Sequence, residues 1–290
     1  MKTSNLKSAT IAALLGMGLV TGCTNDTINQ KTSNNMETLN LTQEWDKKFP
    51  QSNKVNHRKV TFKNRYGITL AADLYEPKNT ESKLPAIAVS GPFGAVKEQA
   101  SGLYAQTMAE RGFLTLAFDP SYTGESSGEP RNVASPDINT EDFSAAVDFL
   151  IAQPSVDAER IGIIGICGFG GMGLNAAAMD TRIKATVAST MYDMSRVNAN
   201  GYFDTEDSAE ARRNKRKAMN AIRTHDAQNG TTTSGTPGLP ASIKGDEPQF
   251  VKDYFDYYKT DRAFHARAIN SNGAWNPTLA LSFINMPLLS

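Results

Sequence analysis

The chain has 290 residues, of which 40% are hydrophobic, enough for one sizeable domain with its own core. Its 30 basic and 30 acidic side chains leave no net charge, so the composition gives no indication of a nucleic-acid partner. The two cysteines, Cys23 and Cys167, stand in very different sequence contexts, which argues against a disulfide framework.

Residues 1–22 have the pattern of a lipoprotein signal peptide. Two lysines precede an apolar run over Thr10–Val20, which is short for a transmembrane helix. The run ends in Leu19-Val20-Thr21-Gly22-Cys23, which resembles a bacterial lipobox with cleavage before Cys23. An ordinary signal peptide followed by a coincidental cysteine is the alternative. We predict a lipid on Cys23 and an extracytoplasmic protein anchored to the bacterial cell membrane. Thr24 is not the Asp that retains lipoproteins at the inner membrane, so in a Gram-negative cell we expect the periplasmic side of the outer membrane.

The next residues predict a tether and then the first strands of a sheet. Residues 23–45 are rich in Asn and Thr, as in a flexible linker. His57–Phe62 and Ile68–Tyr75 flank the turn Asn64–Gly67 and predict a hairpin. Leu84–Ser90 is a short apolar strand that leads into Gly91-Pro92-Phe93-Gly94.

Helical and strand patterns then alternate. After Ser90 we predict a helix that ends at Arg111-Gly112, and Phe113–Phe118 is a buried strand that delivers Asp119. A second helix covers Asn139–Gln153, and Ile183–Thr190 is a later strand. The expected apolar face of the first helix is Ala100, Leu103, Tyr104, Thr107 and Met108. This alternation predicts an α/β fold with a doubly wound, mostly parallel sheet.

The stretch Arg160–Asp180 is the strongest signal in the chain. An isoleucine-rich strand runs into a turn crowded with glycines, and Met172–Met179 favours helix. Strand, sharp turn and helix form the setting of a nucleophile elbow, and Cys167 stands at its apex. A helix N-terminus stabilises a thiolate, and the N–H of Gly168 would point at the oxyanion formed in acyl transfer.

Two structural alternatives to the nucleophile elbow remain open. Cys167 would also suit a buried small residue in a glycine-rich turn. The turn would equally suit a phosphate, because helix N-termini and glycines bind anions. The dinucleotide-binding fingerprint fits poorly, since it needs an acidic partner about 20 residues further on, at the end of the next strand. The lysine of a phosphate-binding loop is missing.

These residues resemble the α/β-hydrolases, in the cysteine-bearing branch that includes dienelactone hydrolases. The similarity is specific over Ser90–Gln106, Gly165–Gly171 and Met191–Val197, and it extends from about Val60 to the end of the chain. It implies hydrolysis of a carboxylic ester or thioester through a Cys167 acyl-enzyme, without a metal or organic cofactor. Pro92 has no N–H, so we expect Phe93 to give the second oxyanion donor beside Gly168.

The resemblance also implies a division of the chain. We assign residues 46–196 to an α/β-hydrolase core, 197–277 to a cap insertion, and 278–290 to the start of a C-terminal part. The cap would contain a charged helix over Asp204–Gln228 and a loop over Asn229–Pro248. An aromatic stripe then follows at helical spacing: Phe250, Tyr254, Tyr257 and Tyr258. This stripe either packs the cap or lines an acyl pocket.

The catalytic base is the weak point of this interpretation. Only His225 and His265 follow Cys167, and both fall in the predicted cap, while His57 precedes the elbow. The family has two further strands after this point, which carry the acid and the histidine. We therefore expect a C-terminally truncated chain with impaired activity. Asp193 is a fallback position for the acid, although the sequence favours a structural or cap-anchoring role for it. The strand Ile183–Thr190 would then lie at an edge of the sheet and favour aggregation.

The substrate and even catalysis itself stay open at this level. Dienelactone hydrolases carry a Glu where this chain has Ser90-Gly91, and Glu98 comes too late, which argues against a dienelactone substrate. The alternatives are peptidase-like cleavage of an acyl-amino bond and a non-catalytic, lipid-anchored binding module. The sequence contains no signal for the oligomeric state.

Overall fold

The structure, a computed structural model, describes residues 37–78 and 82–285. The predicted signal peptide, the lipobox and Cys23 lie outside the described residues, so they stay predictions. Within the described residues, no helix is both long and apolar enough to cross a membrane.

The described residues form a six-stranded, mostly parallel sheet in the order β1-β2-β4-β3-β5-β6. Strands β1 and β2 are an antiparallel hairpin, and β2 pairs antiparallel with β4. The pairs β3–β4, β3–β5 and β5–β6 are parallel. The bounds are β1 Val55–Lys63, β2 Thr69–Pro77, β3 Leu84–Ser90, β4 Leu114–Phe118, β5 Val156–Ile166 and β6 Ile183–Ser189. This sheet confirms the predicted α/β class.

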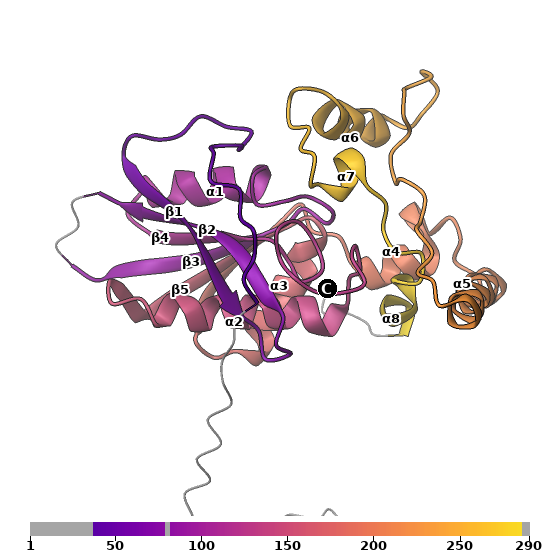
Figure 1. The fold of residues 1–290 in the computed structure, drawn as a ribbon, viewed down its shortest axis with the longest axis horizontal. Helices are drawn as coiled ribbons and strands as arrows, with labels where there is room; N and C mark the ends of the chain where they lie inside the picture. Colours follow the sequence, from indigo (N-terminus) through magenta and orange to yellow (C-terminus); the bar gives the residue numbers. More distant parts are fainter. Residues whose placement is uncertain (1–36, 79–81, 286–290) are drawn as a thin grey trace, which may run out of the picture. The chain divides into compact units, whose positions relative to one another are not determined.

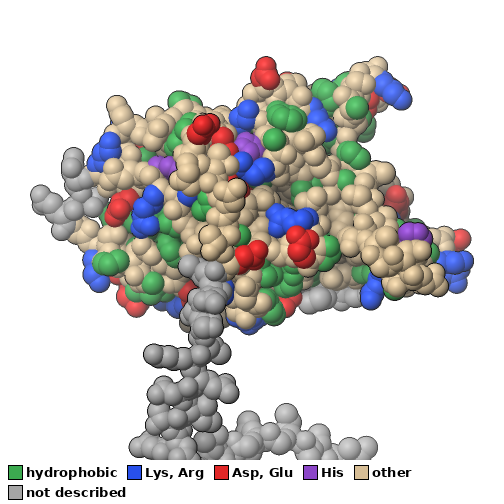
Figure 2. All heavy atoms as spheres, in the orientation of Figure 1, with side chains coloured by type: hydrophobic (Ala, Val, Ile, Leu, Met, Phe, Trp, Pro, Cys, Tyr) green, Lys and Arg blue, Asp and Glu red, His purple; other side chains and the backbone are tan. Residues whose placement is uncertain are grey.

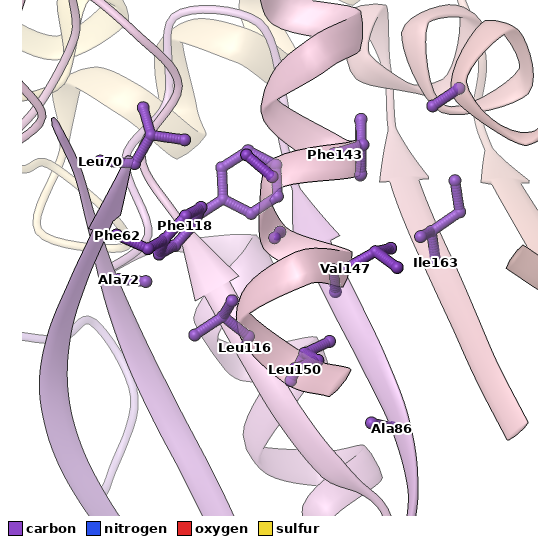
Figure 3. Close-up of a cluster of buried hydrophobic side chains, with 14 of the residues drawn as sticks. Phe62, Leu70, Ala72, Ala86, Leu116, Phe118, Phe143, Val147, Leu150 and Ile163 are labelled. Atoms are coloured by element: carbon purple, nitrogen blue, oxygen red, sulfur yellow. The ribbon is translucent and has the colours of Figure 1, made fainter. Parts of the chain in front are cut away.

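Helices cover both faces of the sheet (Figure 1). Helix α1 (Ala100–Ala109) lies on one face, and α2 (Pro136–Ile151) and α3 (Gly168–Met179) lie on the other. Side chains alternate between the faces along each strand, so neighbouring residues belong to different cores. On β4, for example, Leu116 and Phe118 pack toward α2, and Ala117 packs toward α1. The core beneath α2 is built largely from Phe, Leu, Ile and Val side chains of the sheet and of the helix itself (Figure 3).

Helix α1 buries a different face from the predicted one. Leu103 and Tyr104 are 45% and 43% exposed, and the buried residues are Ser101, Gly102, Ala105, Gln106 and Ala109. The small side chains let the helix approach its neighbours closely. A Cβ on Gly102 would lie 2.2 Å from the Lys97 carbonyl oxygen, so only glycine fits there. The face predicted from the apolar pattern is therefore wrong. The helix packs so closely against its neighbours that small side chains, and not the large apolar ones, face the core.

Helix α2 begins three residues before the predicted start. Ser135 caps it, with its hydroxyl accepting from the Ile138 N–H at 3.5 Å, and Pro136 occupies the first turn. Both are ordinary helix-start signals. The predicted helical pattern rested on apolar spacing alone, which does not reach the first turn.

A series of helices follows β6, where the sequence predicts a cap. They are α4 Met194–Asn200, the 3-10 helix η1 Tyr202–Asp204, α5 Ala209–Asn229, α6 Gln249–Lys259, α7 Ile269–Asn272 and α8 Ala280–Asn285. Helix α4 packs against α5 and α8, and α6 packs against α7 (Figure 1). Acidic and basic side chains are interspersed over the face drawn in Figure 2, in keeping with the absence of net charge.

Strand β6 is the last strand of the described sheet, and in that sheet it pairs with β5 alone. Its Val187 is 52% exposed. Within the described residues, β6 is therefore an edge strand with an apolar side chain open to solvent, the kind of edge at which strands of separate chains pair.

Candidate active site at Cys167

Cys167 occupies the sharp turn between β5 and α3. Its backbone angles are φ 57° and ψ −125°, a conformation that residues other than glycine rarely adopt. Three backbone hydrogen bonds hold it: Cys167 N–H donates to Ser189 O at 2.9 Å, and Cys167 O accepts from Gly170 N–H at 2.9 Å and Tyr192 N–H at 3.2 Å. The helix begins directly at Gly168, so its first N–H groups lie at the thiol.

The backbone N–H groups of Gly168 and Phe93 lie close enough to the Cys167 sulfur to stabilise its thiolate. Burial raises the pKa of the Cys167 thiol above its ordinary value, and the two N–H groups offset only part of that effect. The structure therefore brings together the three residues that the sequence selected. Their roles as nucleophile and oxyanion donors stay predictions.

Gly168 and Phe93 approach each other because position 168 has no side chain. A Cβ there would lie 2.8 Å from Met194 Sδ and 2.9 Å from Phe93 Cβ. The Phe93 ring stacks on Trp275 with centroids 4.3 Å apart and also contacts Phe283. This packing fixes the chain that carries the Phe93 N–H, and only residues remote in sequence supply it.

A group of tyrosines lies beside the thiol; we call Tyr192, Tyr202, Tyr254 and Tyr258 the tyrosine cluster. The hydroxyls of Tyr192 and Tyr254 are 2.8 Å apart, and the Tyr202 ring lies 5.9 Å from the Tyr192 ring. Burial, together with the nearby thiol, raises the pKa of Tyr202, Tyr254 and Tyr258. Two members of the aromatic stripe thus lie near Cys167. Sequence reasoning missed Tyr192 and Tyr202, although Tyr192 directly follows a strand end, which was a usable signal.

Each of the three histidines has a carboxylate partner. His57 Nε2 lies 2.7 Å from Asp73 Oδ1, and the exposed His225 lies 3.5 Å from Asp226. His265 is buried, which lowers its pKa, and Nε2 lies 3.5 Å from an oxygen of Asp46. The Nδ1 atom of His265 accepts the backbone N–H of Arg267 at 3.3 Å.

Both ring nitrogens of His265 are therefore engaged, and the structure does not bring His57, His225 or His265 into a hydrogen bond with the thiol. Asp193 caps helix α4, its carboxylate accepting the Arg196 N–H at 2.9 Å. The fallback acid position thus holds a helix cap. The sequence already favoured such a structural role.

A second polar site, unforeseen from the sequence, is an ionic cluster centred on Lys97. The fully buried Lys97 Nζ lies 2.7 Å from Glu98, 2.8 Å from Asp119 and 2.6 Å from Glu125. Arg267 adds contacts of 2.8 Å to Glu98 and 2.6 Å to Asp46, and Lys59 lies 2.7 Å from Glu125. We use the name ionic cluster for Asp46, Lys59, Lys97, Glu98, Asp119, Glu125 and Arg267.

Most charges of the ionic cluster hold one another ionised, whereas burial and the neighbouring Glu98 raise the pKa of Asp119 despite its contact with Lys97. Burial alone would raise the pKa of Glu98 and Glu125, but Lys97 and its neighbours lower both, that of Glu125 to about 2. Burial alone would lower the pKa of Lys97, and Asp119 and Glu98 raise it well above its usual value. Among residues 37–78 and 82–285, no set of three His, Cys or carboxylate side chains is arranged for a metal ion.

The ionic cluster also joins distant parts of the chain. Arg267 donates to Thr42 Oγ1 at 3.0 Å, and the Thr42 N–H donates to Glu125 at 2.7 Å. Trp45 lies nearby, with Lys47 Nζ 4.7 Å from the centre of its ring. Glu98 was considered in the sequence only as a residue displaced from the thiol, and here it binds Lys97 and Arg267. The boundary predicted at residues 45 and 46 stays a prediction.

Comparison with known proteins places the chain in a family. Residues 66–281 match the family described as X-Pro dipeptidyl-peptidase (S15 family). The chain is 60% identical over 290 residues to the uncharacterized protein PA2218 of Pseudomonas aeruginosa, an alignment that covers 98% of this chain and 76% of that protein. The crystal structure of PA2218 superposes with a TM-score of 0.84 and 64% identity, over 88% of this chain and 78% of the other.

More distant similarities agree on the fold. The chain is 34% identical over 132 residues to the thiohydrolase AneE of Aspergillus aculeatus, covering 46% of this chain and 41% of that protein. The crystal structure of the α/β-hydrolase GrgF from a Penicillium species superposes with a TM-score of 0.62 at 20% identity, over 80% of this chain and 74% of the other. The chain therefore belongs to the X-Pro dipeptidyl-peptidase (S15) family and has an α/β-hydrolase fold.

Proposed function

We propose that this protein reacts with carboxylic esters or thioesters through Cys167. The thiolate attacks the carbonyl carbon, and the N–H groups of Phe93 and Gly168 stabilise the oxyanion. The bond to the leaving group then breaks, and the released alkoxide or thiolate takes a proton from water. Hydrolysis of the acyl-Cys167 by a second water would return the thiol and a carboxylic acid.

The observation that carries the proposal is the convergence of two backbone N–H groups on the sulfur of a strained turn residue. The similarity to a thiohydrolase supports a thioester as substrate. The tyrosine cluster favours an uncharged acyl group. Its rings and hydroxyls contact one another beside the thiol and carry no charge at neutral pH.

We further propose that turnover is impaired in the 290-residue chain. A general base must accept the thiol proton and later activate water. The three histidines have carboxylate partners, and Asp193 caps a helix. Acylation then depends on the small thiolate fraction, and deacylation depends on unassisted water, so the acyl-enzyme accumulates.

The test is the reaction of the chain with a p-nitrophenyl ester and an aryl thioester, followed by intact mass and product release. We expect a single acyl adduct on Cys167 that decays slowly. Cys167→Ala should abolish the adduct, whereas the matched Cys23→Ala variant should retain it. Equal product release by Cys167→Ala would reject Cys167 as the nucleophile.

Two alternatives are separated by the same measurements. Peptidase-like cleavage of acyl-amino bonds is suggested by the family's description, and an X-Pro aminoacyl amide that acylates Cys167 faster than an ester would favour it. The second alternative is a binding module without chemistry, in which neither adduct nor product forms. Multiple rapid turnovers would exclude that module and also contradict the proposed impairment.

We also propose that Cys23 carries a lipid anchor and that the protein is extracytoplasmic. Metabolic labelling with a clickable fatty acid tests the anchor.

A further inference from the structure

Asn270 joins the cap segment to the chain that carries the Phe93 N–H. Its side-chain Nδ2 donates to Phe93 O at 2.8 Å, and its backbone N–H donates to Gly94 O at 3.1 Å. One residue thus holds two consecutive carbonyls. They follow directly on the peptide unit whose N–H faces Cys167.

Close packing at Gly94 makes this attachment specific. Gly94 has φ +84°, and a Cβ there would lie 2.5 Å from Asn270 Oδ1. A side chain at position 94 would strain the backbone and displace Asn270. The position of Asn270 therefore requires glycine at position 94. The Asn270 side chain also lies close enough to the hydroxyl of the buried Tyr258 of α6 to lower the pKa of that hydroxyl.

Residues 96–99 of the same loop have separate attachments. Gln99 accepts the Val96 N–H at 3.1 Å and donates to Ala263 O at 2.6 Å, and Lys97 lies in the ionic cluster. Loss of the Asn270 side chain would therefore free the Phe93 carbonyl, while the Phe93 ring stays packed on Trp275 and the other end of the loop stays in place. The contacts of Asn270 thus bear on the direction of the Phe93 N–H more than on the fold.

We propose that Asn270 is a positioning residue, which directs the Phe93 N–H at the oxyanion site and couples it to Tyr258 of α6. This inference rests on the proposed function, because the oxyanion arises only if Cys167 is acylated. A donor that is misplaced by even a fraction of its hydrogen-bond length loses much of its effect on a developing negative charge.

The experiment compares acylation rates of Asn270→Ala, Asn270→Asp and Tyr258→Phe in single-turnover reactions with the aryl thioester. We expect Asn270→Ala to acylate about 10- to 100-fold more slowly than the parent chain. Asn270→Asp retains the size of the side chain but turns a carboxylate toward the Phe93 carbonyl, so it should be at least as slow. Tyr258→Phe should have a smaller defect of about 3-fold, since it removes only the hydroxyl that lies beside the Asn270 side chain.

A second measurement separates positioning from mere stability. The Phe93 N–H lowers the thiol pKa, so misdirecting it should raise the pKa of Cys167 in the folded Asn270 variants, as read from the pH dependence of alkylation. The control is Asn276→Ala. Asn276 is a buried asparagine of the same segment that bonds Thr278, and its variant should stay within about twofold of the parent rate.

The two hypotheses fail in different ways. If the folded Asn270 variants and Tyr258→Phe keep the parent rate and thiol pKa while Cys167→Ala is dead, the positioning role is wrong and the nucleophile stands. If Cys167→Ala reacts like the parent chain, the proposed function itself fails. Should Asn270→Ala not fold, an unchanged rate in both Asn270→Asp and Tyr258→Phe would still overturn the inference.

Discussion

The surroundings of Cys167 and the ionic cluster around Lys97 differ in the kind of groups that each of them buries. At Cys167, one ionisable thiol is surrounded by backbone N–H groups and tyrosine hydroxyls. In the ionic cluster, carboxylates and cations are buried together, and Lys97 alone contacts three acids. The buried charges of the ionic cluster thus attach distant segments of the chain to one another. At Cys167, in contrast, burial favours the neutral thiol.

The largest expected effect comes from removing the centre of the ionic cluster. Lys97→Met should lower the free energy of unfolding by about 3–5 kcal/mol, because Glu98, Asp119 and Glu125 would be buried without their shared cation. Urea denaturation followed by circular dichroism measures this loss. The control is Lys184→Met on β6, whose side chain is 47% exposed and should contribute under about 1 kcal/mol. Equal effects of the two substitutions would contradict a special role of the buried cluster.

A smaller effect should appear as a pH dependence. The pKa of Glu125 falls from 4.5 to about 2 in the folded protein, so its stabilisation is complete above the unfolded value. It is lost as the pH falls from about 4.5 to about 2. Glu125→Gln should therefore be less stable than the parent chain at pH 7, by at most about 3 kcal/mol. The gap should close in acid, as measured by denaturation at several pH values. A gap as wide at pH ~3 as at pH ~7 would show that ionisation is not its cause.

The smallest effect concerns the thiol and sharpens the contrast. Because burial raises the pKa of Cys167, its alkylation by iodoacetamide should rise about tenfold per pH unit up to and beyond pH ~9 without a plateau. A Cys23→Ser background isolates this reaction. The same chain in concentrated urea should instead level off near the pKa of a free thiol. A plateau below pH ~8 in the folded protein would mean a thiol activated at rest and would contradict this description.

Local sequence signals were sufficient for the frame of the molecule. Leu84–Ser90 is β3 as predicted, and the glycine-rich turn places Cys167 between a strand and a helix. Phe93 was selected for a local reason too, since Pro92 has no N–H to donate. Each of these features depends on residues that are adjacent in the chain.

Features that depend on contacts between residues far apart in the chain could not be predicted from the sequence. The charges at Lys97 and Glu98 are unremarkable until Glu125 and Arg267 pack against them. The sequence predicted that the helix N-terminus lowers the pKa of the Cys167 thiol. It did not reveal how deeply the thiol is buried, and burial raises that pKa by more than the N–H groups lower it. Asn270 shows the same limit, since its role follows from a contact across 177 positions of the chain.

One of the chain's two tryptophans lies near Cys167 and the other near the ionic cluster. Trp275 stacks on Phe93 beside the thiol, and Trp45 lies against Lys47 and His57 near the ionic cluster. Each region thus has its own intrinsic fluorophore. With Trp45→Phe, the remaining emission reports on the Phe93 chain during acylation. With Trp275→Phe, it reports on the charged attachment during unfolding, so the two events become optically separable in one protein.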